Sequence, residues 1–115
     1  VEDVAPIYKK KYWDRIKGDD LPSGIDWAAF DWAVNSGTGR AAKAVQKIVG
    51  AVRDGAIGPK TLALVSKQDP KYMIQEIGKI RQEFYENLST FETFGKGWTR
   101  RNKETTEVAM DMAQA

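Results

Sequence analysis

The residues best suited to chemistry in this sequence are a carboxylate, an amide and a hydroxyl on one largely apolar segment. Asp31 lies between Phe30 and Trp32, and Asn35 and Ser36 follow about one helical turn later on the same side of a helix. Burying an ionised carboxylate costs several kcal/mol unless it is paired or hydrogen-bonded. Asp31 therefore either bonds a neighbouring helix, or lines a groove where it binds sugar hydroxyls or orients a catalytic partner.

These two interpretations predict different behaviour for the substitution Asp31→Asn. If Asp31 bonds the backbone amides or a basic side chain of another helix, the variant loses several kcal/mol of folding free energy. If Asp31 lines a groove, the variant changes function more than stability. Glycoside hydrolysis commonly uses two carboxylates roughly 5 to 10 Å apart. Asp31 alone provides no such pair, so we assign no catalytic residue.

Aromatic side chains form a second group of candidate binding residues. The sequence holds four Trp in 115 residues, and flat amphipathic rings suit the apolar faces of sugars. Tyr12 and Trp13 are adjacent, so both cannot point into the same core, and one of them is expected near the surface. Together with Asp31, Asn35 and Ser36, they make up the candidate substrate-binding residues.

The composition excludes several classes of chemistry. The sequence has no Cys and no His, which removes disulfides, thiol catalysis, Ser-His-Asp mechanisms and His-ligated zinc. We therefore expect no cofactor and no metal. A formal net charge of +2 gives no indication of a nucleic-acid partner, and no apolar run approaches the roughly 20 residues of a membrane span. The oligomeric state stays open.

The pattern of apolar residues predicts a single all-α domain of five or six helices. Expected helices cover residues 3–16, 23–35, 38–49, 59–67, 70–88 and 98–112. A capping box of Ser23 and Asp26 would open the second of these, which is apolar nearly all round and should be the central helix. Residues 89–97 are expected to form a flexible loop that Phe91 and Phe94 anchor.

The segment between Gly50 and Thr61 is rich in turn residues. Its glycines and Pro59 exclude a helix and favour tight turns, with Ile57 as an apolar plug and Pro59 as the first residue of the next helix. The run Asp54-Gly-Ala-Ile-Gly-Pro-Lys-Thr61 resembles the DGxxGPxT signature of helical peptidoglycan-binding modules.

Four further motifs carry a closer resemblance, and they span nearly the whole chain. They are IYKKKYWD (7–14), DDLPSGI (19–25), FDWAVNSG (30–37) and FGKGWTRR (94–101). In this order they are similar to the lysozyme-like N-acetylmuramidases of phages and Gram-negative bacteria, glycoside hydrolase family 108, often labelled secretion activators. The resemblance implies a lysozyme-like orthogonal helical fold that cleaves the glycan strand of peptidoglycan, followed by a predicted peptidoglycan-binding domain.

The family's general-acid glutamate lies in a Glu-Gly-Gly-Tyr motif ahead of the segment that matches residues 7–14. That motif is absent from this sequence, so no catalytic residue is carried over and the N-terminal catalytic helix is expected to be missing. Residues 1–37 then correspond to the remainder of the lysozyme-like catalytic part. Residues 38–115 correspond to the peptidoglycan-binding part, with both packed as one globular unit.

The resemblance leaves three functions open. The chain is interpreted first as the saccharide-binding portion of a muramidase, whose enzyme activity by itself stays undecided. The alternatives are a non-catalytic peptidoglycan-binding module and a helical accessory protein of a secretion or lysis system. Peptidoglycan is the expected partner. No signal peptide is visible, and we expect synthesis in the cytoplasm and action in the periplasm or at the cell wall.

Overall fold

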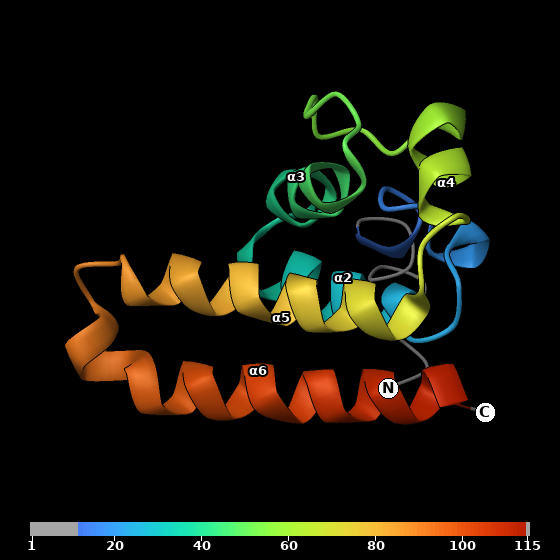
Figure 1. Ribbon diagram of the computed structural model, residues 1–115. Coiled ribbons are helices and arrows are strands. Elements are labelled where there is room, and N and C mark those ends of the chain that lie inside the picture. The colour runs from blue at the N-terminus through green and yellow to red at the C-terminus, as the bar shows by residue number, and fades with distance from the viewer. Residues whose placement is uncertain (1–11, 115) are drawn as a thin grey trace, which may run out of the picture.

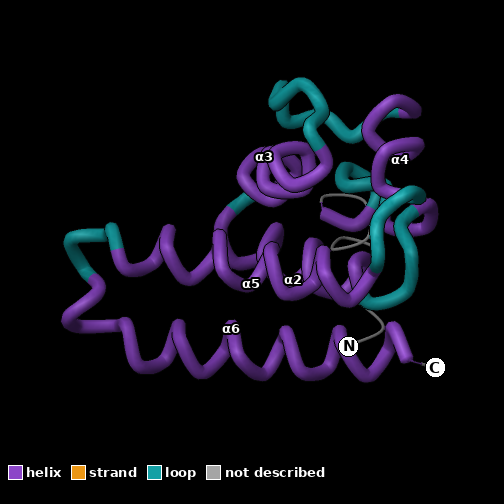
Figure 2. Tube along the Cα trace, in the orientation of Figure 1, coloured by secondary structure: helices purple, strands orange, loops and turns teal. Residues whose placement is uncertain are grey.

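The computed structural model describes residues 12–114, and this part of the chain consists of helices and loops without a strand (Figures 1 and 2). The elements are η2 (Gly18–Asp20), α2 (Ile25–Ser36), α3 (Thr38–Val49), α4 (Pro59–Val65), α5 (Pro70–Glu86) and α6 (Phe91–Gln114). The predicted all-α class is confirmed. Most of the helix expected over residues 3–16 lies outside the described residues, and a turn covers 14–17.

Helix α2 is the central element, as its apolar sequence predicts. It contacts η2, α3, α5 and α6, and a helix surrounded in this way must be apolar on most sides. Its Ile25, Ala29, Trp32 and Ala33 are each at most 1% exposed. The carboxylate of Asp31 therefore enters a densely packed interior.

Helices α5 and α6 form a long antiparallel pair that covers one side of α2 (Figure 1). Asp69 caps α5 by accepting a hydrogen bond from the Lys71 backbone N–H at 3.3 Å, and Pro70 occupies the first turn. Helix α5 buries Met73, Ile74 and Ile77 at the predicted spacing. Its next buried positions are filled by Arg81 and Tyr85, which brings polar groups to the interface with α2.

Helix α6 begins at Phe91, so the predicted loop over residues 89–97 is wrong for most of its length. Gly95 allows the ring of Phe91 to pack against the helix one turn later, because a Cβ at residue 95 would meet ring atoms at 2.8 Å. Glycines usually weaken a helix interior, but here a close contact accounts for Gly95.

The expected capping box at the start of α2 is also wrong. The Ser23 hydroxyl donates instead to the backbone carbonyl of Met112 on α6, at 3.3 Å. Asp26 does reach back and accepts from the Gly24 backbone N–H at 3.0 Å. The start of α2 is thus tied to the end of α6.

The loop between α3 and α4 is held by one buried amide. Gln46, 1% exposed, donates from Nε2 to Asp54 Oδ1 at 2.8 Å and to the Ala56 carbonyl at 3.0 Å, and its Oε1 accepts from Gly55 N–H at 3.0 Å. Ile57 is 3% exposed, so the predicted plug is confirmed. The DGxxGPxT run therefore has a structural role, which is to fix this loop against α3.

None of the helices within residues 12–114 is both long and apolar enough to cross a membrane.

Candidate functional site

The centre of the site is an ion-pair cluster around Asp31. Arg81 of α5 donates from Nη1 to Asp31 Oδ2 at 2.9 Å. Arg101 of α6 donates from Nε to Oδ1 at 3.1 Å and also binds Oδ1 through Nη2. The Thr105 hydroxyl donates to Oδ2 at 2.9 Å. Both oxygens of Asp31 are thus occupied by groups from two other helices, the arrangement expected if Asp31 holds the helices together.

The pKa of Asp31 lies below its ordinary value. Burial is the largest single influence and raises the pKa, but hydrogen bonds from Arg101, Arg81 and Thr105, together with the positive charge of Arg81, outweigh it. The carboxylate is ionised at neutral pH and has no proton to donate. Asp31 therefore cannot serve as the general acid of a glycoside hydrolase, which needs a raised pKa.

A hydrogen-bond chain runs from this cluster to the end of α2. Arg81 Nε donates to the Tyr85 hydroxyl at 2.7 Å, and that hydroxyl lies 2.6 Å from Asn35 Oδ1. Because guanidinium N–H groups only donate, the Tyr85 proton must point to Asn35. The Ser36 hydroxyl, 2.7 Å away, donates to the same oxygen. Asn35 Oδ1 is thereby fixed as an acceptor, and its Nδ2 is left to donate elsewhere.

A hollow of about 420 Å³ opens to solvent beside this chain, lined by Asp31, Val34, Asn35 and Arg101. Asp31 is only 6% exposed and forms its inner wall, whereas Asn35 is exposed at its edge. Arg101, whose side chain is 61% exposed, has no hydrogen bond from Nη1 within residues 12–114. The hollow therefore offers two hydrogen-bond donors, Asn35 Nδ2 and Arg101 Nη1, to an entering acceptor.

The other two candidate residues do not line this hollow. The Trp13 ring meets the Phe30 ring edge-on with centroids 5.4 Å apart, and its indole N–H donates to Asp19 Oδ1 at 2.8 Å. Tyr12 is partly buried against the core. Neither is among the described residues that line the hollow. The structure thus brings Asp31, Asn35 and Ser36 together and places Tyr12 and Trp13 apart from them.

Sequence reasoning did not identify the partners of Asp31. Arg81 is 1% exposed and occupies a core position of α5, one turn after Ile77 and one turn before Tyr85. A charged residue on an otherwise apolar stripe is a signal that another buried charge must face it.

No group of three or more potential metal-ligating side chains occurs within residues 12–114.

The helical fold and the polar-edged hollow beside its central helix define a lysozyme-like, all-α domain. Comparison with known families agrees with this class. Residues 1–37 match the family described as Glycosyl hydrolase 108, and residues 40–103, more than half of the chain, match the Predicted Peptidoglycan domain. The chain therefore belongs to the Predicted Peptidoglycan domain family, and its first 37 residues are similar to part of the Glycosyl hydrolase 108 family. The family predicted from the four sequence motifs is confirmed.

A solved structure has the same fold. The chain is 42% identical to SagA of Brucella abortus, with a TM-score of 0.96, over 99% of this chain and 66% of that protein. The chain thus spans slightly less than two thirds of the length of SagA. Among curated protein sequences, none matches significantly.

Proposed function

We propose that this chain is the saccharide-holding portion of a peptidoglycan glycan-strand hydrolase of the lysozyme or N-acetylmuramidase type. The observation that supports this most is the hollow whose edge presents Asn35 Nδ2 and Arg101 Nη1. Sugar hydroxyls and N-acetyl carbonyls are acceptors for such donors. Asp31 positions Arg101 directly, through a hydrogen bond. It positions Asn35 indirectly, through the chain of hydrogen bonds formed by Arg81 and Tyr85.

In this proposal Asp31 acts as a positioning residue. Its two oxygens are occupied, and its low pKa keeps it ionised. A general acid would have to come from chain that precedes the segment matching the family motif at residues 7–14. The Ser36 hydroxyl and the partly exposed rings of Tyr12 and Trp13 are proposed to contact the glycan strand further from the hollow.

We also propose that the chain consists of two functional parts. Residues 1–37 would belong to the lysozyme-like part and residues 38–115 to the peptidoglycan-binding part. Contacts from Asp31 to Arg81, Arg101 and Thr105 cross this boundary, which supports packing of both parts as one unit. Action in the periplasm or at the cell wall follows from the proposed substrate.

The test is an assay for new reducing ends in purified peptidoglycan, with this chain and with a version extended at its amino terminus. Cleavage by the extended version, and its loss in Asn35→Ala, would support the hydrolase. No reducing ends from either protein would end the enzyme proposal.

A second candidate is a non-catalytic peptidoglycan-binding module. The observation that favours it is that both Asp31 oxygens are hydrogen-bonded, so that none of the described residues that line the hollow can serve as a general acid. Sedimentation with insoluble peptidoglycan separates the candidates. Binding without cleavage, unchanged by the extension, would favour the module. Neither binding nor cleavage would favour the helical accessory protein.

A further inference from the structure

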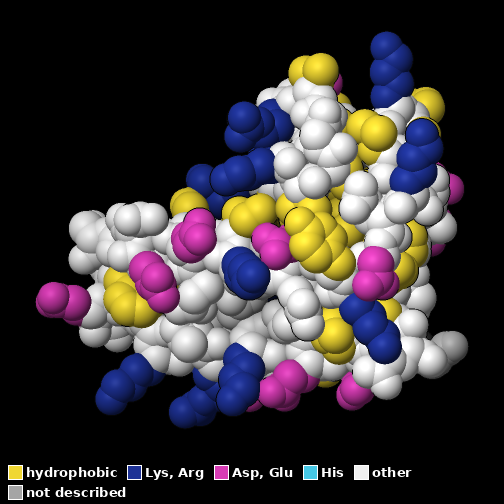
Figure 3. All heavy atoms as spheres, in the orientation of Figure 1, with side chains coloured by type: hydrophobic (Ala, Val, Ile, Leu, Met, Phe, Trp, Pro, Cys, Tyr) yellow, Lys and Arg dark blue, Asp and Glu magenta, His cyan; other side chains and the backbone are white. Residues whose placement is uncertain are grey.

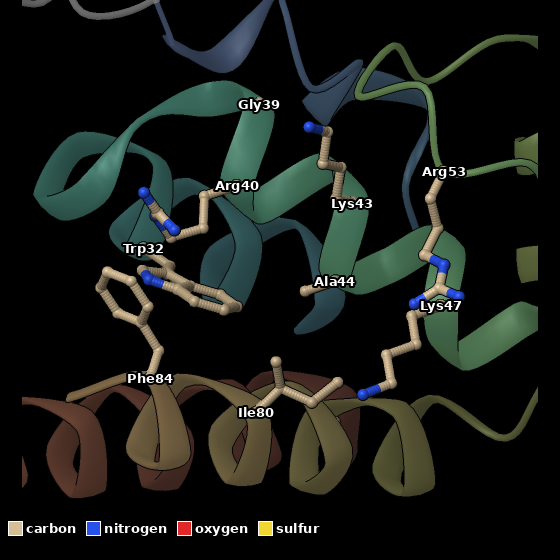
Figure 4. A pocket seen from close by; sticks show the side chains of 9 residues that line it. All are labelled: Trp32, Gly39, Arg40, Lys43, Ala44, Lys47, Arg53, Ile80 and Phe84. Atoms are coloured by element: carbon tan, nitrogen blue, oxygen red, sulfur yellow. The ribbon is translucent and has the colours of Figure 1, made fainter. Parts of the chain in front are cut away.

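A second hollow, distinct from the one at Asp31, lies between α3 and α5. It has a volume of about 440 Å³, and its floor is formed by Trp32, Ala44, Ile80 and Phe84. Four cationic residues line the hollow, Arg40, Lys43 and Lys47 of α3 and Arg53 of the following loop, and the Lys43 amine points away from Ile80 and Phe84 (Figure 4). Figure 3 shows Lys and Arg side chains gathered over α3, beside apolar side chains along α5. We call this hollow the basic groove.

Within the described residues, the basic groove is lined by cations without a lining acid. Among the described residues, none of the four cations forms an ion pair. Lys43 and Lys47 are one turn apart on α3, a spacing at which like charges repel and destabilise a helix. Cations that repel one another and form no ion pair within residues 12–114 leave the groove suited to an external anion.

The groove also has fixed geometry. The Arg40 guanidinium lies over the Phe84 ring, with Cζ 4.1 Å from the centroid, so one end of the groove holds an oriented cation. At the other end, the Gln46 contacts to residues 54–56 fix the loop that brings Arg53 beside Lys47 (Figure 4). The indole N–H of Trp32, toward the Arg40 end, is buried and has no acceptor in the described structure.

We propose that the basic groove binds the carboxylates of the short peptides that peptidoglycan carries on its glycan strand. This inference rests on the proposed function. Arg40 and Lys47 are seven residues apart on one helix face, about 10 Å along the axis, and three residues of an extended peptide span about the same length. Carboxylates spaced along such a peptide would meet cations at both ends of the groove, with the aliphatic parts on Ile80 and Phe84.

The experiment measures dissociation constants for a soluble glycan fragment with its peptide, for the same fragment without peptide, and for the free peptide. We expect the chain to bind the peptide-bearing fragment about tenfold more tightly than the bare one, because each exposed charge contact adds a modest increment. The double variant Lys47→Gln with Arg53→Gln should remove this preference. Lys60→Gln with Lys67→Gln, on and just after α4, changes net charge equally and should keep it.

Several results would overturn the proposal. One is equal affinity of the unmodified chain for bare and peptide-bearing fragments, which leaves the proposed function intact. Another is loss of the preference in the Lys60 and Lys67 variant, which would indicate net charge alone. Tighter, groove-dependent binding of inorganic polyphosphate than of the peptide would assign the groove to a phosphate polymer. Binding of the free peptide without any binding of bare glycan would instead refute the saccharide proposal and support the groove.

Discussion

Arg81 Nη1 lies 2.9 Å from Asp31 Oδ2, and the two side chains are 1% and 5% exposed. The pair joins α2 to α5 across 50 residues of sequence. Removing one member of a buried pair costs more than the pair itself contributes, because the other charge stays buried and unpaired. The fold should therefore be sensitive to substitution of either member of the pair.

The first prediction concerns Asp31→Asn. The variant leaves the buried Arg81 guanidinium without a counter-charge, so the free energy of unfolding should fall by about 3 to 5 kcal/mol. Urea or thermal unfolding measures this. Asp111→Asn, which removes an exposed acid from α6, is the control and should change stability by less than about 0.5 kcal/mol. Unchanged stability in Asp31→Asn would contradict the structural role of the cluster.

The second prediction concerns pH. The pKa of Asp31 is lower in the folded than in the unfolded chain, so its stabilising contribution is complete above the unfolded pKa of about 4 and is lost as the pH falls below it. Unfolding free energies measured between pH 6 and acid should therefore decline below about pH 4. Arg101→Gln removes the three hydrogen bonds from Arg101 to Asp31, which lower the pKa, and should make that decline shallower. An identical slope in this variant would contradict the assignment.

The third prediction concerns Tyr85→Phe. Loss of the hydroxyl leaves Arg81 Nε without its acceptor and frees the Asn35 amide to rotate, at a cost of about 1 to 3 kcal/mol in stability. Peptidoglycan binding should weaken as well, since Asn35 Nδ2 is no longer oriented. Tyr72→Phe, at a residue that is 48% exposed, serves as the control. Weakened binding in the control to the same degree would refute the orientation argument.

The fourth prediction concerns Gln46→Ala. The substitution removes the amide that ties residues 54–56 to α3, so stability should fall by about 1 to 3 kcal/mol because buried polar groups lose partners. Hydrogen exchange should accelerate first at the backbone N–H of Gly55, which donates to Gln46. The exposed Gln75, replaced by Ala, is the comparison and should leave exchange in that loop unchanged.

The fifth prediction compares two glycines with positive φ, Gly24 at 94° and Gly37 at 105°. Alanine at either position incurs backbone strain of about 1 to 3 kcal/mol. A Cβ at residue 24 would in addition lie 2.5 Å from the Ala109 carbonyl oxygen, whereas nothing lies within 4 Å at residue 37. Gly24→Ala should therefore be clearly the more destabilising in unfolding measurements. Equal losses would show that the contact with α6 relaxes freely.

Much of the fold could be predicted because the determining signals are local. Pro59 and Asp69-Pro70 mark helix starts, and Gly37 ends α2 as expected. The apolar surroundings of Asp31 correctly indicated a central helix with a carboxylate that needs a partner. These features depend on residue types within a few positions of one another.

The partners of Asp31 could not be predicted in the same way. Arg81 and Arg101 lie 50 and 70 residues further along the chain, and no local pattern indicates which basic residue faces which acid. The beginning of α6 was missed because Gly95 and Gly97 favour a loop by propensity, while the Phe91 contact favours a helix. Ser23 likewise had a partner on α6 that only tertiary packing supplies. Tyr12 and Trp13 were grouped with Asp31 by residue type, although neither is among the described residues that line the hollow beside Asp31.

The position of the Asp31 cluster has a consequence for how such proteins can diversify. The acid lies in the region that matches Glycosyl hydrolase 108, and both arginines lie in the region that matches the Predicted Peptidoglycan domain. Recombination that exchanged one region for an unrelated one would leave a buried charge without its partner. The stability of each region therefore depends on the other, although each matches a separate family model.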